Sequence, residues 1–121
     1  MSKTVLIVED DALQMKLVTD LLHSVGYDTI QSVDGVDALS LANSFRPDLI
    51  LMDLKLPNHS GLHYTKLLKA ERHLNYIPVL AVTGFPVYSG ADSVAEAGCV
   101  ALLSKPISAN TLFEAVKKYI H

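Results

Sequence analysis

The chain has 121 residues, 50% of them hydrophobic and 19% charged, a composition that excludes a disordered chain and leaves room for one ordinary globular domain. Its formal net charge of −3 provides no general attraction to nucleic acid or to an anionic membrane surface. The single cysteine, Cys99, excludes an intramolecular disulfide, and no apolar run approaches the roughly 20 residues that cross a bilayer, so we expect a cytoplasmic protein.

The first half of the chain alternates apolar runs with segments of helical periodicity. Strands covered on both faces are predicted at 5–8 and 48–52, because residues 5–8 and 49–52 are continuous apolar runs, and a less apolar strand pattern lies at 27–33. Two helices are predicted between these strands, the first ending at Gly26 and the second before Pro47. Their apolar positions recur at helical spacing: Leu13, Leu17, Val18, Leu21, Leu22 and Val25 in the first, and Ala38, Leu39, Ala42 and Phe45 in the second.

The second half of the chain repeats the alternation. The segment Thr83-Gly84-Phe85-Pro86 breaks the apolar run before it and marks the end of a strand. Ser108 is a typical N-cap for the last helix. The predicted elements are a helix at 62–74, a strand at 77–82, a helix within 87–97, a strand at 100–103 and a helix after Ser108.

Strict alternation of five strands with five helices predicts one α/β domain over residues 1–121, in which helices cover both faces of a parallel sheet. In open sheets of this kind, ligands bind in the crevice at the carboxyl ends of the strands. The predicted strand ends of this sequence carry acidic, hydroxyl and basic residues: Glu9, Asp10, Asp53, Thr83 and Lys105.

These residue types together indicate phosphoryl transfer around a divalent metal ion. Carboxylates that lie close together repel each other, and a hard cation such as Mg²⁺, which prefers oxygen ligands, removes the conflict. Asp53 is the candidate nucleophile, because it ends a buried strand and a carboxylate can form an aspartyl-phosphate. Asp10 and Glu9 suit the metal, one directly and one through water. Lys105 and Thr83 are suited to hold phosphoryl oxygens.

Other polar residues are interpreted structurally. The segment Asp11-Ala12-Leu13-Gln14 resembles a capping box that opens the first helix. Asp34 and Asp37 are predicted to be helix-capping or surface residues. His59 and His63 are four residues apart, a spacing that suits zinc on a helix, but no third ligand is evident and no zinc site is expected.

Over essentially its whole length the sequence resembles the receiver domain of two-component response regulators. The segments that carry the resemblance are Val8-Glu9-Asp10-Asp11, Leu51-Met52-Asp53-Leu54-Lys55-Leu56-Pro57 with Gly61, Val82-Thr83-Gly84, and Lys105-Pro106. Residues 47–53 and 104–108 are further similar to the single-domain DivK-type regulators of bacterial cell division and polarity. The resemblance implies a flavodoxin-like, CheY-like fold with strand order 2-1-3-4-5, and no output domain.

The resemblance also implies the chemistry of the site. Asp53 would accept a phosphoryl group from a histidine kinase or a histidine phosphotransfer protein, and would lose it slowly by self-dephosphorylation. Thr83 and Lys105 would contact that group, and the Lys105–Pro106 peptide bond would be cis. The implied Mg²⁺ site consists of oxygen ligands: Asp10, Asp53, the backbone carbonyl of Lys55, and Glu9 through water.

The expected function is signalling by a phosphorylated binding module. The resemblance implies a downstream protein partner at the face of the fourth helix, fifth strand and fifth helix, and a monomer or a weak dimer. A true phosphatase with an aspartyl intermediate would need a second Asp two residues after Asp53, where this chain has Lys55, and is therefore disfavoured.

Two positions depart from the family pattern. Leu102 stands where relatives usually carry Tyr or Phe as the moving part of the switch, and Gly84 follows Thr83 in place of Ala or Ser. These departures leave open a receiver-like adaptor that binds its partners independently of phosphorylation. Phe85 and Tyr88 would then either contribute to an apolar partner surface or pack locally.

Overall fold

The structure is a computed structural model that describes residues 2–84 and 91–120, so the surface predicted around Phe85 and Tyr88 lies outside the described residues. Within those residues, no helix is both long and apolar enough to cross a membrane. The strands and helices alternate in the order β1 (Thr4–Val8), α1 (Ala12–Ser24), β2 (Asp28–Ser32), α2 (Ala38–Phe45), β3 (Leu49–Asp53), α3 (Gly61–Ala70), β4 (Val79–Thr83), α4 (Ala91–Ala97), β5 (Ala101–Ser104) and α5 (Ala109–Tyr119).

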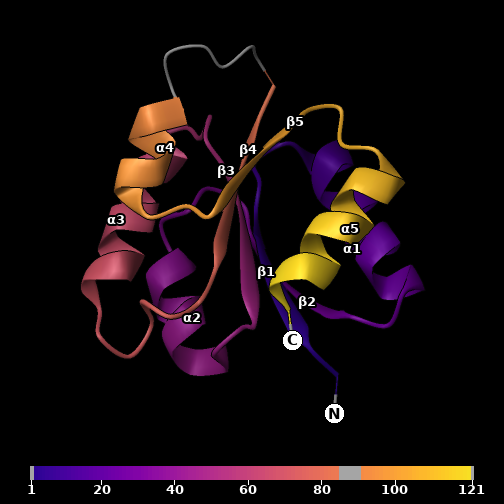
Figure 1. The fold of residues 1–121 in the computed structure, drawn as a ribbon, viewed down its shortest axis with the longest axis horizontal. Coiled ribbons are helices and arrows are strands. Elements are labelled where there is room, and N and C mark those ends of the chain that lie inside the picture. Colours follow the sequence, from indigo (N-terminus) through magenta and orange to yellow (C-terminus); the bar gives the residue numbers. More distant parts are fainter. Residues whose placement is uncertain (1, 85–90, 121) are drawn as a thin grey trace.

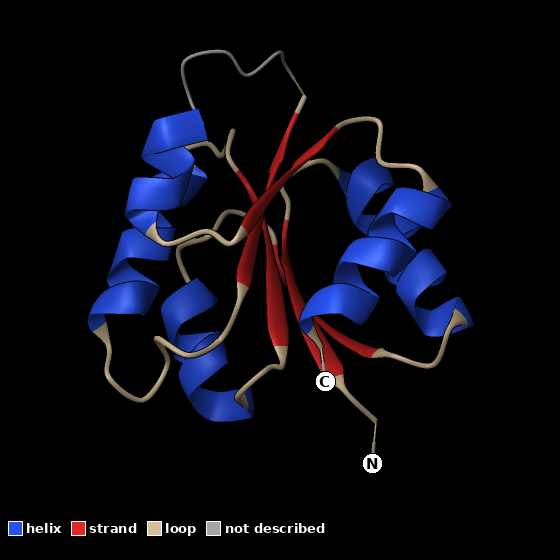
Figure 2. Cartoon of the chain, in the orientation of Figure 1, coloured by secondary structure: helices blue, strands red, loops and turns tan. Residues whose placement is uncertain are grey.

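All five strands run parallel in one sheet with the order β2-β1-β3-β4-β5, which confirms the predicted topology. Helices α1 and α5 lie together on one face of the sheet, and α2, α3 and α4 cover the other (Figures 1 and 2). From β1 the chain continues to β2 at one edge of the sheet, whereas from β3 it continues to β4 and β5 toward the other edge. The loops that follow β1 and β3 therefore leave toward opposite faces of the sheet. A crevice at the carboxyl edge of the sheet follows from this divergence.

The core consists of two hydrophobic clusters, one on each face of the sheet. Along β3, Leu49 and Leu51 pack in the cluster with α1 and α5, whereas Ile50 and Met52 pack in the cluster with α2, α3 and α4. All five residues of this strand are buried, including its last residue, Asp53. Packing on both sides therefore holds the Asp53 carboxylate in place at the edge of the sheet.

Short polar side chains open the helices as predicted at Asp11 and Ser108. Asp11 accepts hydrogen bonds from the N–H groups of Leu13 and Gln14, and Ser108 accepts one from the N–H of Thr111. The second half of the predicted capping box is not formed: Gln14 Oε1 has no hydrogen-bond partner among the residues described. The N–H of Asp11 donates instead to the carboxylate of Glu9, at 3.1 Å.

The apolar stripes predicted for the first two helices are buried only in part. The side of α1 that enters the core carries Met15, Val18 and Leu22, and the other side of the helix faces solvent. Phe45 is the last residue of α2, where Arg46 turns the chain through left-handed backbone, so its ring falls outside the core. The exposed members of the stripes are Leu13, Leu17, Val25 and Phe45.

The boundary that differs most from the prediction is the end of α3. The helix ends at Ala70, because Glu71 is extended, with φ −90° and ψ 120°. Leu74 is buried, but it belongs to a turn in which its N–H donates to the carbonyl of Glu71. Asp37 precedes α2 as predicted, yet its carboxylate accepts the Ser32 hydroxyl at 2.5 Å and does not cap the helix.

Candidate functional site

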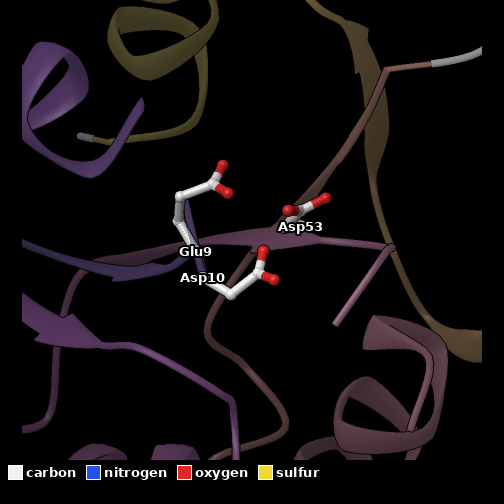
Figure 3. A group of neighbouring side chains, drawn as sticks. All are labelled: Glu9, Asp10 and Asp53. Carbon is white, nitrogen blue, oxygen red and sulfur yellow. The ribbon is translucent and has the colours of Figure 1, made fainter. Parts of the chain in front are cut away.

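Three carboxylates meet at the carboxyl ends of the two central strands, β1 and β3. Glu9 and Asp10 directly follow β1, and Asp53 ends β3; Figure 3 shows the three side chains gathered at this edge. One carboxylate oxygen from each residue lies within 4.8 Å of the others. The topology thus brings together residues that are separated by more than forty positions in the sequence.

Asp53 is buried, and both of its carboxylate oxygens are hydrogen-bonded. Oδ1 accepts the backbone N–H of Lys55 at 3.1 Å, and Oδ2 accepts the ammonium of Lys105 at 3.1 Å. Only 3% of the residue's surface is exposed. The side chain is therefore oriented by one neutral donor and one cation.

Glu9 is the second buried carboxylate of the group. Its Oε1 lies 2.9 Å from the ammonium of Lys105, and its Oε2 accepts the N–H of Asp11. The pKa of Glu9 is raised to about 7, chiefly by burial and further by the neighbouring Asp53, against the opposing hydrogen bonds from Lys105 and the N–H of Asp11. Asp10, in contrast, is exposed and lies on the open side of the cluster.

Lys105 supplies a positive charge from the loop after β5. Its N–H donates to the carbonyl of Thr83 at 2.7 Å, and the Lys105–Pro106 peptide bond is cis, as the family resemblance implied. Burial alone would lower the pKa of Lys105, but its hydrogen bonds with Glu9 and Asp53 outweigh burial and raise it. The ammonium therefore stays charged between the two carboxylates.

A cavity of about 600 Å³ opens over these groups. The three carboxylates bring more negative charge than the single ammonium of Lys105 neutralises, and all of them offer hard oxygen donors. This donor set fits a divalent cation of the Mg²⁺ type, which takes one or two carboxylates and keeps several waters. The cavity is lined by Glu9, Asp10, Asp11, Asp53, Lys55, Leu56, Pro57, Gly84 and Lys105.

Gly84 and Leu102 are the two positions that depart from the family pattern. Gly84 lines the cavity, and a Cβ added there would lie 3.7 Å from Cδ of Lys105, an ordinary contact, so Ala would fit. Leu102 is half-buried in β5 and packs against the cluster under α2, α3 and α4. Thr83 ends β4 and pairs with Ser104 of β5.

Gly61, which belongs to the pattern that carries the family resemblance, positions the site through a contact that the sequence did not predict. A Cβ added to Gly61 would lie 2.1 Å from the backbone carbonyl oxygen of Asp53, which is far inside contact distance. The N–H of Gly61 also donates to the carbonyl of Leu54 at 3.0 Å. The first turn of α3 therefore rests on the backbone of Asp53 itself, an approach open to glycine alone.

Comparisons with known proteins agree with this geometry. The sequence profile described as "Response regulator receiver domain" matches residues 5–117. The polar-differentiation response regulators DivK of Brucella anthropi and Brucella ovis are each 48% identical over 120 residues, covering 99% of this chain and 98% of theirs.

Solved structures show the same fold. The Vibrio cholerae chemotaxis protein CheY4 superposes with a TM-score of 0.94 at 24% identity, covering 99% of this chain and all of the other. The receiver domain of the sensor histidine kinase PA1611 from Pseudomonas aeruginosa has a TM-score of 0.90 at 27% identity, and 98% of each chain is covered. That structure has a magnesium ion coordinated in its active site cleft.

Proposed function

This chain belongs to the response regulator receiver domain family, and on that basis we propose that Asp53 accepts a phosphoryl group from a histidine kinase or a histidine phosphotransfer protein. The matches also confirm the predicted resemblance to DivK-type regulators. The observation that carries the proposal is the buried Asp53 carboxylate, held by Lys105 and by the N–H of Lys55 beside two further acids and an open cavity.

In the proposed transfer, an oxygen of Asp53 forms a bond to phosphorus while the bond between phosphorus and the donor's histidine nitrogen breaks. The donor's ring keeps the electron pair and takes up a proton. The hydrogen bond from the N–H of Lys55 orients the attacking carboxylate. Lys105 is within reach of a phosphoryl group on Asp53, because its ammonium already contacts Oδ2. Thr83, at the end of the adjacent strand, would donate its hydroxyl to the same group.

A divalent ion is part of the proposal. Mg²⁺, when bound, supplies positive charge that neutralises the transferring phosphoryl group. The set of ligands that we propose is Asp10, Asp53 and the backbone carbonyl of Lys55, with Glu9 acting through water. Asp10, which is exposed and has no cation beside it among the described residues, is the ligand most open to an arriving ion.

We further propose that residues 1–121 act as one receiver domain, in the cytoplasm, as a monomer or a weak dimer. Signalling would then proceed by binding of a protein partner to the face formed by α4, β5 and α5. Phosphate would be lost by slow self-dephosphorylation, so the chain would be a phosphoacceptor rather than an enzyme.

A second candidate function is an adaptor that binds partners whether or not Asp53 is phosphorylated. The observation that favours it is Leu102, an aliphatic side chain packed against the core where the family switch usually has an aromatic ring. The chain has the full set of proposed site residues, and its three carboxylates and Lys105 lie together in the structure. This arrangement favours the phosphoacceptor.

The proposed function is tested by incubating the protein with Mg²⁺ and acetyl phosphate and recording its intact mass, with Asp53→Asn as the control. We expect only the wild-type chain to gain one phosphoryl group. When EDTA is present from the start, the wild-type chain should gain none. If a folded sample that binds Mg²⁺ gains nothing, the adaptor is the better description.

A further inference from the structure

A second cavity lies beside the carboxylate site, between helix α1 and the edge strand β2. Its volume is about 440 Å³, which falls within the range of small-molecule sites. One wall belongs to α1, and the other consists of Gln31 of β2 and Val33 just after it. Glu9 and Asp10 line both this cavity and the one over Asp53, so the two cavities meet at these acids.

Packing and hydrogen bonds between side chains hold the two walls together. Met15 and Thr19 line the cavity from α1 and are only 6% and 8% exposed, and Met15 belongs to the hydrophobic cluster under α1 and α5. Gln31 donates to the Thr19 hydroxyl at 2.9 Å, and one turn further along α1 His23 shares a hydrogen bond with Thr29. The cavity is therefore formed before any ligand arrives, which lowers the entropy cost of binding.

The charges that line the cavity leave one carboxylate without a counter-charge. Lys16, the only cation of the lining, pairs with Asp20 at 2.9 Å. Glu9 pairs with Lys105, also at 2.9 Å. Asp10 forms no ion pair within the described part of the chain. A ligand with a single positive charge would therefore balance this lining.

The same cavity offers apolar surface that water covers in the free chain. Val33 is 62% exposed although it is aliphatic, and Ala12 on the wall of α1 is also exposed. A ligand with an apolar body would cover these side chains and rest on Met15, and burial of apolar surface favours binding. An inorganic cation cannot use this surface, and an organic anion would be repelled by Asp10.

We propose that this cavity binds a small organic monocation with an apolar body, whose ammonium or amidinium group lies against Asp10. A consequence for regulation rests on the proposed function, in which Asp10 is also a ligand of Mg²⁺. The organic cation and the metal ion would then oppose each other at Asp10, and each would weaken the binding of the other by the same factor. An occupied cavity would accordingly slow phosphorylation of Asp53.

The test is an NMR titration of the ¹⁵N-labelled full chain in EDTA with 2-naphthylmethylammonium as the probe. We expect saturable shifts of the amide signals of residues 12–20 and 31–33. The neutral alcohol 2-naphthylmethanol has nearly the same shape and should bind about threefold to fivefold more weakly, the size typical of an exposed ion pair. The anion 2-naphthoate should bind more weakly still.

Two pairs of measurements on variants separate the apolar contact from the charge. Val33→Ser should weaken binding of the amine by about fivefold. Val36→Ser is its matched control, because Val36 is also 62% exposed but lines neither of the two cavities, and it should bind as the wild type does. Asp10→Asn should reduce the affinity for the amine to that for the alcohol and leave the affinity for the alcohol unchanged. Circular dichroism establishes that each variant folds.

The last arm repeats the amine titration with saturating Mg²⁺ in place of EDTA, and we expect affinity to fall by the same factor as in Asp10→Asn. The inference is overturned if the wild type does not bind the amine, if amine and alcohol bind equally well, or if Val33→Ser binds the amine as tightly as the wild type. The titrations in EDTA require neither a metal ion nor phosphoryl transfer. A chain that binds the amine in EDTA but never gains a phosphoryl group would therefore contradict the proposed function and leave this site standing.

Discussion

At the scale of single residues, Lys105 lies between two acids, Glu9 and Asp53. Its ammonium lies 2.9 Å from Glu9 and 3.1 Å from Asp53, and its side chain is 19% exposed. A cation in this position screens the repulsion between the carboxylates, and it also competes with a divalent ion for them. The same side chain therefore stabilises the metal-free fold and weakens metal binding.

Lys105→Met tests both the stabilisation of the fold and the competition with Mg²⁺. In EDTA we expect the free energy of unfolding to fall by about 2–3 kcal/mol, because two buried carboxylates lose their counter-charge. Affinity for Mg²⁺ should rise by about tenfold, which corresponds to about 1.4 kcal/mol, because a competing cation is gone. Urea denaturation with and without Mg²⁺, together with calorimetry, measures both.

A matched control is Lys16→Met, which removes an exposed lysine paired with the exposed Asp20 at 2.9 Å. Exposed ion pairs contribute little, so this variant should unfold and bind Mg²⁺ like the wild type. Equal stability of Lys105→Met and the wild type in EDTA would show that the bridge does not support the fold.

Glu9 gives the metal-free protein a specific dependence on pH. Burial raises the pKa of Glu9 to about 7 in the folded chain, above the ordinary value of 4.5. An acid whose pKa is raised by folding stabilises the fold when protonated, so its contribution is full below pH 4.5 and is lost as the pH rises through 7. Bound Mg²⁺ favours the charged carboxylate and should reverse this trend.

We expect the free energy of unfolding in EDTA to fall between pH 5 and pH 8 by about 2–3 kcal/mol more for the wild type than for Glu9→Gln. The variant cannot titrate at this position, so the difference between the two curves isolates Glu9 from the other carboxylates. Urea denaturation across this pH range makes the measurement. Parallel curves for the two proteins would contradict the assignment.

At the scale of elements, the contact between α3 and β3 determines where Asp53 lies. Gly61→Ala would place a Cβ 2.1 Å from the carbonyl oxygen of Asp53, and a backbone atom cannot move away by changing rotamer. We expect a loss of about 2–4 kcal/mol in the free energy of unfolding, together with slower phosphorylation by acetyl phosphate. Gly84→Ala is the matched control, because its Cβ would lie 3.7 Å from Lys105. Should both variants prove equally stable, the contact does not position the site.

The sequence predicted the strands that are continuous apolar runs, and the polar residues at which those strands end. The aliphatic runs before Glu9 and Asp53 identified β1 and β3, and parallel topology then placed both acids at one edge. Exposure was harder to predict, since helical spacing alone did not show that Leu13 and Phe45 face solvent. Burial depends on which side of a helix meets the sheet, and that is decided by packing between elements.

Several contacts of the site could not be predicted because they use backbone atoms or distant residues. The capping-box pattern predicted that the N–H of Asp11 donates to the Gln14 side chain, yet it donates to the Glu9 carboxylate. The bridge from Lys105 to both acids joins the ends of β1, β3 and β5. Such contacts exist only once the sheet order is fixed, so residue types were predictable and their partners were not.

At the scale of the whole molecule, the site and the two hydrophobic clusters share one sheet. Alternate residues of the central strands belong to opposite clusters, so disruption of the sheet would expose both clusters at once. Ligands at the carboxyl edge should accordingly stabilise the molecule as a unit. Binding to the folded state alone adds about 2.7 kcal/mol when the ligand concentration is 100 times its dissociation constant.

The accessibility of Cys99 to a thiol reagent tests whether a ligand at the carboxyl edge stabilises the whole molecule. Cys99 is 8% exposed and belongs to the cluster under α2, α3 and α4, and its thiol lies 3.9 Å from the Thr65 hydroxyl of α3. Burial raises the pKa of the Cys99 thiol, so a thiol reagent should modify the native chain far more slowly than the unfolded one. Because the sequence has no other cysteine, the labelling rate follows this position alone.

We expect Mg²⁺ at 100 times its dissociation constant to slow labelling of Cys99 by about a hundredfold, the factor that corresponds to 2.7 kcal/mol. The reason is that exposing this thiol opens the cluster shared with β1 and β3, and so also disrupts the ends of the strands where Asp10 and Asp53 lie. Asp53→Asn should remove most of the effect of Mg²⁺. A rate that does not change with Mg²⁺ would instead mean that the region of α4 and β5 opens by itself, and that the α4–β5–α5 face can rearrange without the site.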